Sequence, residues 1–329
     1  MNLRSGPIRW GIAGTGGIAA SFVDDFARLN EGEGEVVAVG SRSSSSAEAF
    51  AAENGIARAH GSYEALAADP DVDVVYVAGI HPVHAEQTVM FLDAGKHVLV
   101  EKPMALNAAQ VDSMIEAAVR NDRFLMEALW MRFNPAHVDM MERIANGAIG
   151  EVRRISADFS FALPFNIEHR LWDREKGGGA LLDLGIYPVT LAWWVLGPPA
   201  RVDAVGHLAE TGVDDEITLL MSWENGASAS LTAGLRLQGT MTARIEGTAG
   251  TIDIPLPAHC TDHMTITRGS EITELTAEPA GLRHQVVEVH RCLREGVRES
   301  PRMPMATSRA IIEEFDRIRA KIGVRYDAD

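Results

Sequence analysis

Positive charge and cysteine are both scarce in this chain of 329 residues, and each scarcity excludes a class of partner or site. Only 30 Lys and Arg stand against 46 Asp and Glu, which gives a formal net charge of −16. A surface this acidic repels phosphate backbones and anionic headgroups, so we expect neither nucleic acid nor membrane as a partner. The two cysteines, Cys260 and Cys292, form no metal or redox motif and are too few for a disulfide framework. They are typical of free thiols in a cytoplasmic protein.

The chain also lacks the usual targeting signals. Met1–Trp10 has no apolar core of signal-peptide length. No apolar run approaches the ~20 residues that cross a bilayer, so we expect a soluble protein. What the chain does have is a composition that is 46% hydrophobic and 23% charged, which is ordinary for a globular protein. Its length indicates about two domains.

Residues 1–128 alternate short apolar runs with helical patterns. We expect strands over residues 9–12, 35–39, 73–78, 97–100 and 124–127, with helices between them. Strands that alternate with helices imply right-handed βαβ units and a parallel sheet. The sequence therefore predicts an α/β domain over residues 1–128.

The pattern changes after residue 128. Asn134 and Pro135 are typical of a helix start, with the Asn side chain as cap. From Glu151 the hydrophobic period is mostly two, and we expect strands over 152–161, 201–210, 216–223, 227–237, 240–246 and 251–254. Helices are expected near 186–196, 282–295 and 306–322. This order predicts an α+β domain over residues 129–329 with a mostly antiparallel sheet. The C-terminal helix can pack back on the first domain.

A glycine-rich turn follows the first expected strand. Residues Gly14-Thr15-Gly16-Gly17-Ile18-Ala19 contain the pattern G-x-G-x-x-A. In this pattern the first glycine permits a tight turn, the second lets the backbone approach a pyrophosphate, and the alanine lets the helix pack closely. The helix N-terminus adds N–H groups and a positive dipole end. We assign Gly14 to Ile18 to a dinucleotide cofactor; a purely structural turn is the alternative.

The end of the second strand decides which cofactor is preferred. An NAD site usually places Asp or Glu here, to bind the ribose 2′-hydroxyl. This chain has Gly40-Ser41-Arg42 instead, and no carboxylate repels a 2′-phosphate. Arg42 can pair with that phosphate and Ser41 can donate a hydrogen bond, although Arg42 as a solvated loop charge is the alternative. We therefore expect NADP, with NAD less favoured.

Two further groups of residues are candidates for the chemistry. Glu101-Lys102-Pro103 follows the strand at 97–100, and ligands of open α/β sheets lie beyond the carboxyl ends of the strands. Asp183 and Tyr187 follow a glycine run and are four residues apart, so on a helix they share one face. Tyrosine can exchange a proton with a substrate oxygen if a nearby cation such as Lys102 lowers its pKa. A surface lysine, a capping aspartate and a core tyrosine are the structural alternatives.

Together these motifs resemble those of the Gfo/Idh/MocA oxidoreductases, and within that family the subgroup of dimeric dihydrodiol dehydrogenases and NADP-dependent D-xylose dehydrogenases. The similar segments are the glycine loop and residues 101–103, 124–133, 178–187, 245–252 and 281–301. The resemblance covers nearly the whole chain, although segment 162–176 aligns poorly and His284 replaces a frequent aromatic residue.

The resemblance implies a Rossmann domain followed by a substrate-binding and dimerisation domain with a large, open-faced sheet. It also implies that two or more copies of the chain associate through the open face of this sheet, as a homodimer or higher homo-oligomer. It implies Lys102 and Tyr187 at the nicotinamide, with Tyr187 exchanging the proton, Asp183 supporting it and Glu101 beside the cofactor. Trp130, Arg132, Phe133 and Arg170 match positions at or near the substrate pocket. Core packing is the alternative for Trp130 and Phe133.

His81 and His84 suggest a metal only weakly, because neither a cysteine nor a carboxylate completes a site. We expect no metal and assign both histidines to the cofactor edge or to helix capping.

These interpretations predict an NADP-dependent oxidoreductase that moves a hydride between nicotinamide and a hydroxyl or carbonyl carbon. The expected substrates are small polyols: an aldose, a trans-dihydrodiol or a related sugar. An NAD-linked inositol or sugar dehydrogenase and an anhydro-sugar reductase are alternatives within the enzyme class. A cofactor-binding regulator without turnover is an alternative outside it, because fold alone does not establish catalysis.

Overall fold

The computed structural model describes residues 6–30 and 32–329, and the chain forms two compact units. Unit 1 comprises the chain up to Trp130 together with Gly281–Ile312. Unit 2 comprises Met131–Ala280 together with Glu313–Asp329. The sequence pattern changes near residue 128, close to the first boundary between the units, and the later segment of residues 281–312 also belongs to unit 1.

Unit 1 contains a six-stranded sheet in the order β3-β2-β1-β4-β5-β6, and every neighbouring pair is parallel. Its strands are β1 (Ile8–Ala13), β2 (Gly34–Gly40), β3 (Arg58–His60), β4 (Val74–Val77), β5 (His97–Glu101) and β6 (Leu125–Ala128). Strands β4 and β5 are buried along their whole length, as expected when helices cover both faces of a sheet. This order places a topological switch between β1 and β4, where ligands of such sheets bind.

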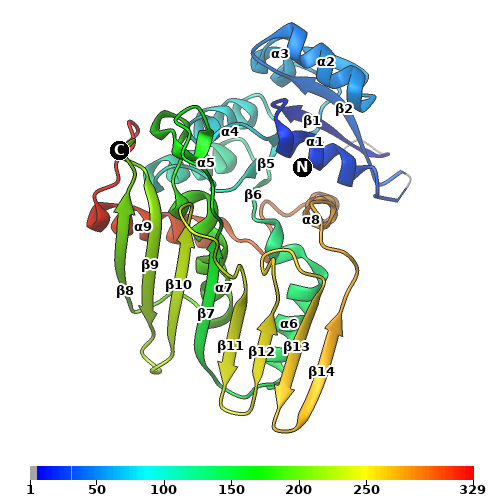
Figure 1. The fold of residues 1–329 in the computed structure, drawn as a ribbon. Coiled ribbons are helices and arrows are strands. Elements are labelled where there is room, and N and C mark those ends of the chain that lie inside the picture. Colours follow the sequence, from blue (N-terminus) through cyan, green and yellow to red (C-terminus); the bar gives the residue numbers. More distant parts are fainter. Residues whose placement is uncertain (1–5, 31) are drawn as a thin grey trace. The chain divides into compact units, whose positions relative to one another are not determined.

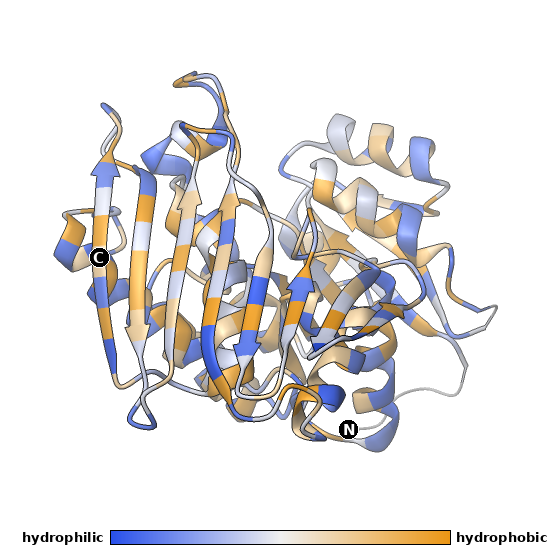
Figure 2. Ribbon diagram, turned by 60° about the horizontal axis from the view of Figure 1, so that its bottom comes forward, coloured by the Kyte–Doolittle hydropathy of each residue, from blue (hydrophilic) through white to orange (hydrophobic). Residues whose placement is uncertain are grey.

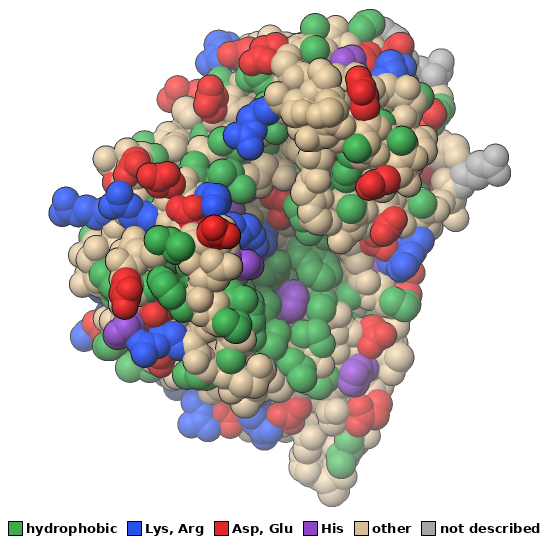
Figure 3. All heavy atoms as spheres, turned by 45° about the horizontal axis from the view of Figure 1, so that its top comes forward, with side chains coloured by type: hydrophobic (Ala, Val, Ile, Leu, Met, Phe, Trp, Pro, Cys, Tyr) green, Lys and Arg blue, Asp and Glu red, His purple; other side chains and the backbone are tan. Residues whose placement is uncertain are grey.

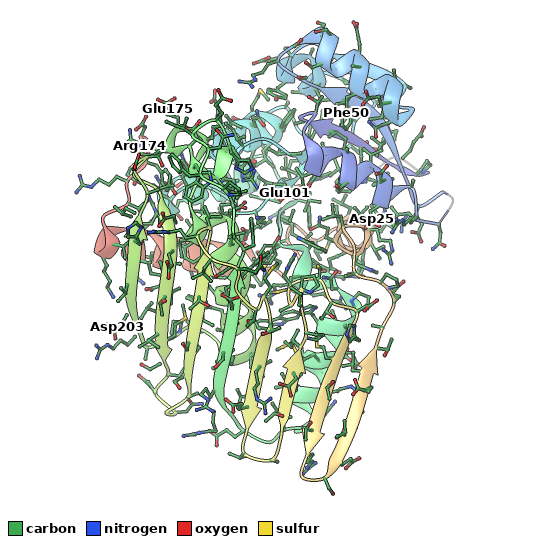
Figure 4. All side chains as sticks on the ribbon, in the orientation of Figure 1. Asp25, Phe50, Glu101, Arg174, Glu175 and Asp203 are labelled. Atoms are coloured by element: carbon green, nitrogen blue, oxygen red, sulfur yellow. The ribbon has the colours of Figure 1, made fainter. Side chains whose placement is uncertain are left out.

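The helices of unit 1 follow the expected alternation. They are α1 (Gly17–Phe26), α2 (Ser44–Asn54), α3 (Tyr63–Ala67), α4 (His84–Asp93), α5 (Ala108–Arg120) and α8 (Arg283–Glu295). Helix α8 is joined to the start of the chain by polar contacts. Asp25, labelled on α1 in Figure 4, accepts a hydrogen bond from the backbone N–H of Arg283 at 2.7 Å. The indole N–H of Trp10 donates to Nε2 of His290 at 2.9 Å. Helix α8 therefore completes the core of unit 1.

Unit 2 contains an eight-stranded sheet in the order β14-β13-β12-β11-β7-β10-β9-β8, as Figure 1 shows. Its strands are β7 (Val152–Ser160), β8 (Arg201–Leu208), β9 (Asp214–Ser222), β10 (Ser228–Gly234), β11 (Ala243–Gly247), β12 (Thr251–Ile254), β13 (His263–Arg268) and β14 (Glu271–Thr276). Only β7 and β10 pair in parallel. The expected combination of a parallel-sheet domain and a mostly antiparallel sheet is confirmed.

Helices α6 (Pro135–Ala145) and α7 (Ile186–Leu196) lie against one face of this sheet (Figure 1). Alternating hydrophobic and hydrophilic bands run along the strands in Figure 2. Leu219 of β9 faces the helices and is buried, whereas its neighbour Leu220 is 57% exposed. Helix α9 (Met305–Ile322) begins in unit 1 and ends in unit 2.

Strands β13 and β14 were absent from the sequence prediction. Their sequences are rich in Thr, Glu and Arg, and this polar composition hides the alternation of Met264, Ile266 and Leu275, which are buried. The Gly269 turn between the two strands, with φ of 61°, is the signal that would have located the hairpin.

Within the described residues, one helical stretch, Arg174–Leu196, is long and apolar enough to cross a bilayer by length and composition. It exceeds the apolar length expected from sequence, but 78% of its most apolar part is buried inside the protein, as in the core helix of a globular domain. On the face shown in Figure 3, acidic side chains are scattered among basic and hydrophobic ones. The negative charge is therefore not gathered into one region of that face.

Candidate active site

The glycine loop between β1 and α1 has the geometry of a phosphate cradle. Gly14 has φ of 123°, and a Cβ there would lie 2.9 Å from the carbonyl oxygen of Ala78 at the end of β4. Only glycine tolerates both the backbone angle and the contact. The spaces beside Gly16 and Gly17 are open, because a Cβ at either would meet no atom within 4 Å. Ala19 is fully buried, as the close packing of α1 requires.

The loop and the start of α1 offer open space and backbone N–H groups to an anion. Gly16 is the N-cap of α1, so the N–H groups of the first turn, including those of Gly17 and Ile18, have no partner within the helix. Ile18 is partly exposed beside them. An anion lying over Gly16 would receive these N–H groups and the positive end of the helix dipole. Thr15 lies in the same turn.

The end of β2 presents a cationic side chain. The backbone N–H of buried Ser41 donates to His60 O at 3.1 Å, which fixes the strand end. Arg42 follows and is exposed to solvent. Ser43 then caps α2 by accepting from the N–H of Ser46 at 3.4 Å. Arg42 is thus free to reach an anion near the start of α2.

The turn after β5 is held by buried polar groups. Glu101, labelled in Figure 4, is buried, and its carboxylate accepts hydrogen bonds from the Tyr76 hydroxyl and from the N–H of Lys102. The Tyr76 ring stacks on Phe22 of α1 with centroids 3.9 Å apart. The Lys102–Pro103 peptide bond is cis. Glu101 therefore fixes the backbone at Lys102, a role that its position in the sequence does not reveal.

His84 braces the same turn from α4. Its Nδ1 lies 2.9 Å from Pro103 O and its Nε2 lies 3.1 Å from Gly79 O. Burial lowers the pKa of His84 to about 4, and the adjacent His81 acts in the same direction. His84 is therefore neutral near pH 7 and is fully enclosed, while His81 is 5% exposed and contacts the His84 ring. His84 therefore contacts the backbone that carries the assigned residue Lys102, through Pro103 O.

In unit 2, Asp183 and Tyr187 lie at the junction of two kinds of helix. Residues Leu181–Gly185 form a π-helical turn, and α7 begins directly after it at Ile186. Asp183 is buried and binds Arg170 in a bidentate ion pair, with N–O distances of 3.1 and 3.2 Å. A guanidinium in this geometry keeps a carboxylate charged and oriented. The predicted pocket residue Arg170 is thus directly joined to the predicted catalytic residue Asp183.

Aromatic rings surround the side of Tyr187. Its ring centroid lies 4.7 Å from that of His259 and 5.3 Å from that of Phe159. His259 also stacks on Phe159 at 4.5 Å. The three rings and Asp158 line a small pocket of about 20 Å³, the size of one water molecule. The Tyr187 ring therefore borders a small hollow lined by aromatic rings and one carboxylate.

The backbone before His259 is anchored by helix α6. Asn134 was expected to cap α6, but its side chain makes no cap hydrogen bond and instead donates to His259 O at 3.2 Å. His137 Nε2 lies 2.8 Å from Ala258 O. Sequence analysis missed His259 because it lies about 70 residues after Tyr187 in an irregular loop.

Three predicted pocket residues lie in a short 3₁₀ segment, Trp130–Phe133. Trp130, the end of the first segment of unit 1, is half-buried. Arg132 is buried, with its guanidinium 4.8 Å from the ring centre of Trp194 on α7. Phe133 is 3% exposed, so its visible role is packing within unit 2. Across the described residues, no group of three His, Cys, Asp or Glu side chains is placed to hold a metal ion.

Comparison with protein families agrees with this geometry. Residues 8–129 match the oxidoreductase family with an NAD-binding Rossmann fold, and residues 137–253 match the GFO/IDH/MocA C-terminal domain. The second match falls on unit 2, which contains the open sheet and Tyr187.

Known proteins are similar over almost the full chain. Human trans-1,2-dihydrobenzene-1,2-diol dehydrogenase is 36% identical, covering 98% of this chain and 99% of its own length. The zebrafish (Danio rerio) protein of the same name is 37% identical over the same shares. Among solved structures, the 3-ketoreductase KijD10 of Actinomadura kijaniata, bound to NADP and TDP-benzene, is 28% identical with a TM-score of 0.83, covering 95% of this chain and 97% of that one. Aldose-aldose oxidoreductase of Caulobacter crescentus has the same fold, with a TM-score of 0.86, 24% identity and shares of 95% and 97%. From its glycine cradle to its open-faced sheet, this chain belongs to the Gfo/Idh/MocA family of oxidoreductases.

Proposed function

We propose that this oxidoreductase uses NADP to interconvert a hydroxyl and a carbonyl group on an aldose, a trans-dihydrodiol or a related sugar-like substrate. The observation that carries the cofactor preference is the exposed Arg42 after β2, where an NAD site would have a carboxylate. A guanidinium there attracts the 2′-phosphate of NADP and offers it several N–H donors.

The chain's own residues divide the work of binding. The N–H groups at Gly16, Gly17 and Ile18 hold the pyrophosphate at the start of α1. Ser41 and Arg42 hold the adenosine end. His84 and Glu101 keep the Lys102 turn rigid through Pro103 O and the Lys102 N–H. The bound nicotinamide supplies the acceptor or donor of hydride.

Proton transfer is assigned to Tyr187. Oxidation of a secondary alcohol releases a hydride from carbon and a proton from oxygen, so a base must meet that oxygen. Tyr187 takes the proton in oxidation and returns it in reduction. The positive charge of Lys102 polarises the substrate oxygen and favours the tyrosinate form. Asp183, fixed by Arg170, orients a substrate hydroxyl or Lys102 itself.

Several observations favour a small polyol as substrate. The relatives of 36–37% identity are named for a cyclic diol, and KijD10 was solved with a nucleotide-linked ligand. The rings of Phe159 and His259 beside Tyr187 suit the apolar face of a sugar or cyclic diol, while Asp183 and Arg170 suit its hydroxyl groups.

Oligomer and location are part of the same proposal. The sheet face that α6 and α7 leave open carries the exposed apolar side chains Val205 and Leu220. We infer that a second copy of the chain covers this face in a homodimer, and that the enzyme acts in the cytoplasm. Sedimentation of the purified protein at several concentrations would reveal a monomer if the first inference is wrong.

The first experiment is a fluorescence titration of the purified protein with NADPH and with NADH. An absorbance screen of D-xylose, D-glucose and trans-cyclohexanediol with NADP⁺ follows it. Tighter binding of NADPH and reduction of NADP⁺ by an aldose or diol are expected. Preference for NADH contradicts the role of Arg42 and favours an NAD-linked dehydrogenase. Tight NADPH binding with no turnover of any aldose, diol, inositol or anhydro sugar favours the regulator.

A further inference from the structure

A fully buried carboxylate lies behind the glycine run of unit 2, and neither the family comparison nor the proposed reaction uses it. Asp214 is the first residue of β9 and has no exposed surface. Its Oδ2 accepts a hydrogen bond of 2.6 Å from the N–H of Leu181, the first residue of the π-helical turn. Its Oδ1 has no hydrogen-bond partner in the structure. Burying a carboxylate costs free energy, so the presence of Asp214 at this position indicates a structural or functional role.

The glycine run is shaped to admit this carboxylate. Gly179 has φ of 120°, and a Cβ there would lie 2.4 Å from Asp214 Oδ1 and 3.1 Å from the hydroxyl oxygen of Tyr326. Any side chain at this position would displace both groups. The hydroxyl of Tyr326, a buried residue of the C-terminal tail, donates to Gly178 O at 2.5 Å. Two polar groups from distant segments thus meet one short stretch of backbone.

The same stretch connects to the predicted catalytic residues. The N–H of Gly179 donates to Leu171 O at 2.9 Å, and the N–H of Gly178 donates to Asp173 O at 2.9 Å. Residues Arg170–Trp172 therefore move with the glycine run, and Arg170 is the partner of Asp183. On the other side, Leu181 begins the turn that contains Asp183 and leads into α7 at Tyr187.

We propose that Asp214, assisted by Tyr326, is a positioning residue that sets the place of the Asp183–Arg170 pair and of Tyr187 by anchoring the backbone from Gly178 to Leu181. This inference rests on the proposed function for its kinetic consequence. The proposal predicts that the side chain at position 214 must accept a hydrogen bond from Leu181 N–H but need not be charged.

The charges around Asp214 agree with that requirement. Two further acidic residues, Asp215 and Glu216, follow Asp214 on β9. Arg319 of α9 lies over the Tyr326 ring, with its guanidinium 5.0 Å from the ring centre. Arg319 is itself paired with Asp316 and Asp329. Burial raises the pKa of Asp214 to about 7; Asp215 acts in the same direction, while the hydrogen bond from Leu181 N–H and the charge of Arg319 oppose the rise. A neutral acceptor is therefore a close mimic of the native group.

Four variants test the anchor. Asp214→Ala removes the acceptor and Asp214→Asn keeps an amide oxygen for Leu181 N. Tyr326→Phe removes only the hydroxyl, and it serves if Asp214→Ala does not fold. Asp215→Asn is the matched control, because that carboxylate is adjacent but bonds His207 at 2.7 Å.

In Asp214→Ala we expect kcat to fall about tenfold or more, because displacement of catalytic groups by ~1 Å is enough for such losses. The dissociation constant for NADPH is expected to stay within about twofold, since the glycine cradle lies in unit 1. Asp214→Asn restores kcat, Tyr326→Phe shows a smaller loss, and Asp215→Asn matches the wild type. Unchanged kcat in Asp214→Ala and Tyr326→Phe overturns the proposal, and so does Asp214→Asn when it is as impaired as Asp214→Ala.

Hydrogen exchange of the amides from 181 to 187 separates this proposal from the proposed function. Faster exchange there in Asp214→Ala or Tyr326→Phe, but not in Asp214→Asn, shows that the anchor holds the turn even if no substrate is turned over. If the wild-type protein turns over no substrate, only the proposed function is contradicted. If amide exchange at residues 181–187 is unchanged in Asp214→Ala and Tyr326→Phe, only the positioning role is contradicted.

Discussion

Arg42 is the residue whose removal most directly tests the cofactor preference. It is exposed and lies two residues after the end of β2, so Arg42→Ala leaves the core intact. Loss of a charge-assisted hydrogen bond costs about 1.5–3 kcal/mol, which raises the dissociation constant for NADPH roughly tenfold to 150-fold. The constant for NADH should not change, because NADH has no 2′-phosphate. Fluorescence titration measures both, with Arg201→Ala, an exposed arginine of unit 2, as control. Equal weakening of NADPH and NADH contradicts the assignment.

Tyr187 is the residue whose hydroxyl the mechanism needs. Tyr187→Phe keeps the ring against Phe159 and His259 while removing the proton donor. Loss of a general acid–base group lowers kcat by about 10²- to 10⁴-fold. NADPH affinity should be retained, because the phosphate cradle lies in the other unit. Steady-state kinetics beside Tyr63→Phe, a tyrosine of α3, gives the comparison. Turnover within twofold of the wild type removes Tyr187 from the chemistry.

At the scale of elements, the loop between β1 and α1 offers two glycines with opposite roles. Gly14→Ala forces a Cβ to within 2.9 Å of Ala78 O at a φ of 123°, so we expect it to destabilise unit 1 by about 1–3 kcal/mol. Gly16→Ala meets open space at a φ of −84° and should leave stability unchanged. Its methyl group instead occupies the place of the pyrophosphate and weakens NADPH binding. Denaturant unfolding measures the stability of both variants, and fluorescence titration measures their affinity for NADPH. An unstable Gly16→Ala contradicts this division.

The elements also show what the sequence could and could not predict. Helix α7 was placed correctly at 186–196, because Gly185 and Gly197 bound a continuous apolar run. Five of the parallel strands were predicted, but the three-residue β3 carries no periodicity of its own. The π-helical turn before α7 was not predicted, because the helix was expected to begin only near Ile186 and nothing in the composition marks i→i+5 hydrogen bonds.

Site residues that act through local backbone could be predicted from sequence, whereas residues that act through distant partners could not. Glycines in a motif are visible in sequence because their role depends on local backbone, as at Gly14. Partners brought together by the fold are not visible. Tyr76 for Glu101, Arg170 for Asp183 and His259 for Tyr187 are each separated by at least 13 residues in sequence, and no local pattern links them. The catalytic roles themselves stay predictions until kinetics tests them.

For the whole molecule, four of the five buried histidines among the described residues make stability depend on pH. Burial lowers the pKa of His84, His97, His137 and His290 to about 4 from 6.5. His290 must be neutral at Nε2 to accept from Trp10, and His97 Nδ1 likewise accepts from the N–H of Phe124. The unfolded chain therefore binds more protons than the folded one between pH 6.5 and 4. Stability is full above this range and is lost as pH falls through it, by up to about 3 kcal/mol for each histidine.

Denaturant unfolding at pH 7.5, 6 and 5 measures this loss. His290→Gln keeps an acceptor for the Trp10 indole but cannot bind a proton in this range. We expect its unfolding free energy to decline less steeply between pH 7.5 and 5 than that of the wild type. His263→Gln, at an exposed histidine of β13, serves as control. An identical decline in His290→Gln and wild type contradicts the assignment.

The hydrogen bond between Trp10 and His290 has a consequence for the newly made protein on the ribosome. The two residues are 280 positions apart, and all of Met131–Ala280 is synthesised between them. At ~5–20 residues per second, the first unit waits roughly 15–60 s for the helix that closes its core. During that interval the surface destined for α8, with Phe26 beside Trp10, stays uncovered. Unit 2 also waits, because its residues 313–329 are synthesised after residues 281–312 of unit 1. Neither unit can therefore complete its core before the last helix of the chain has been made.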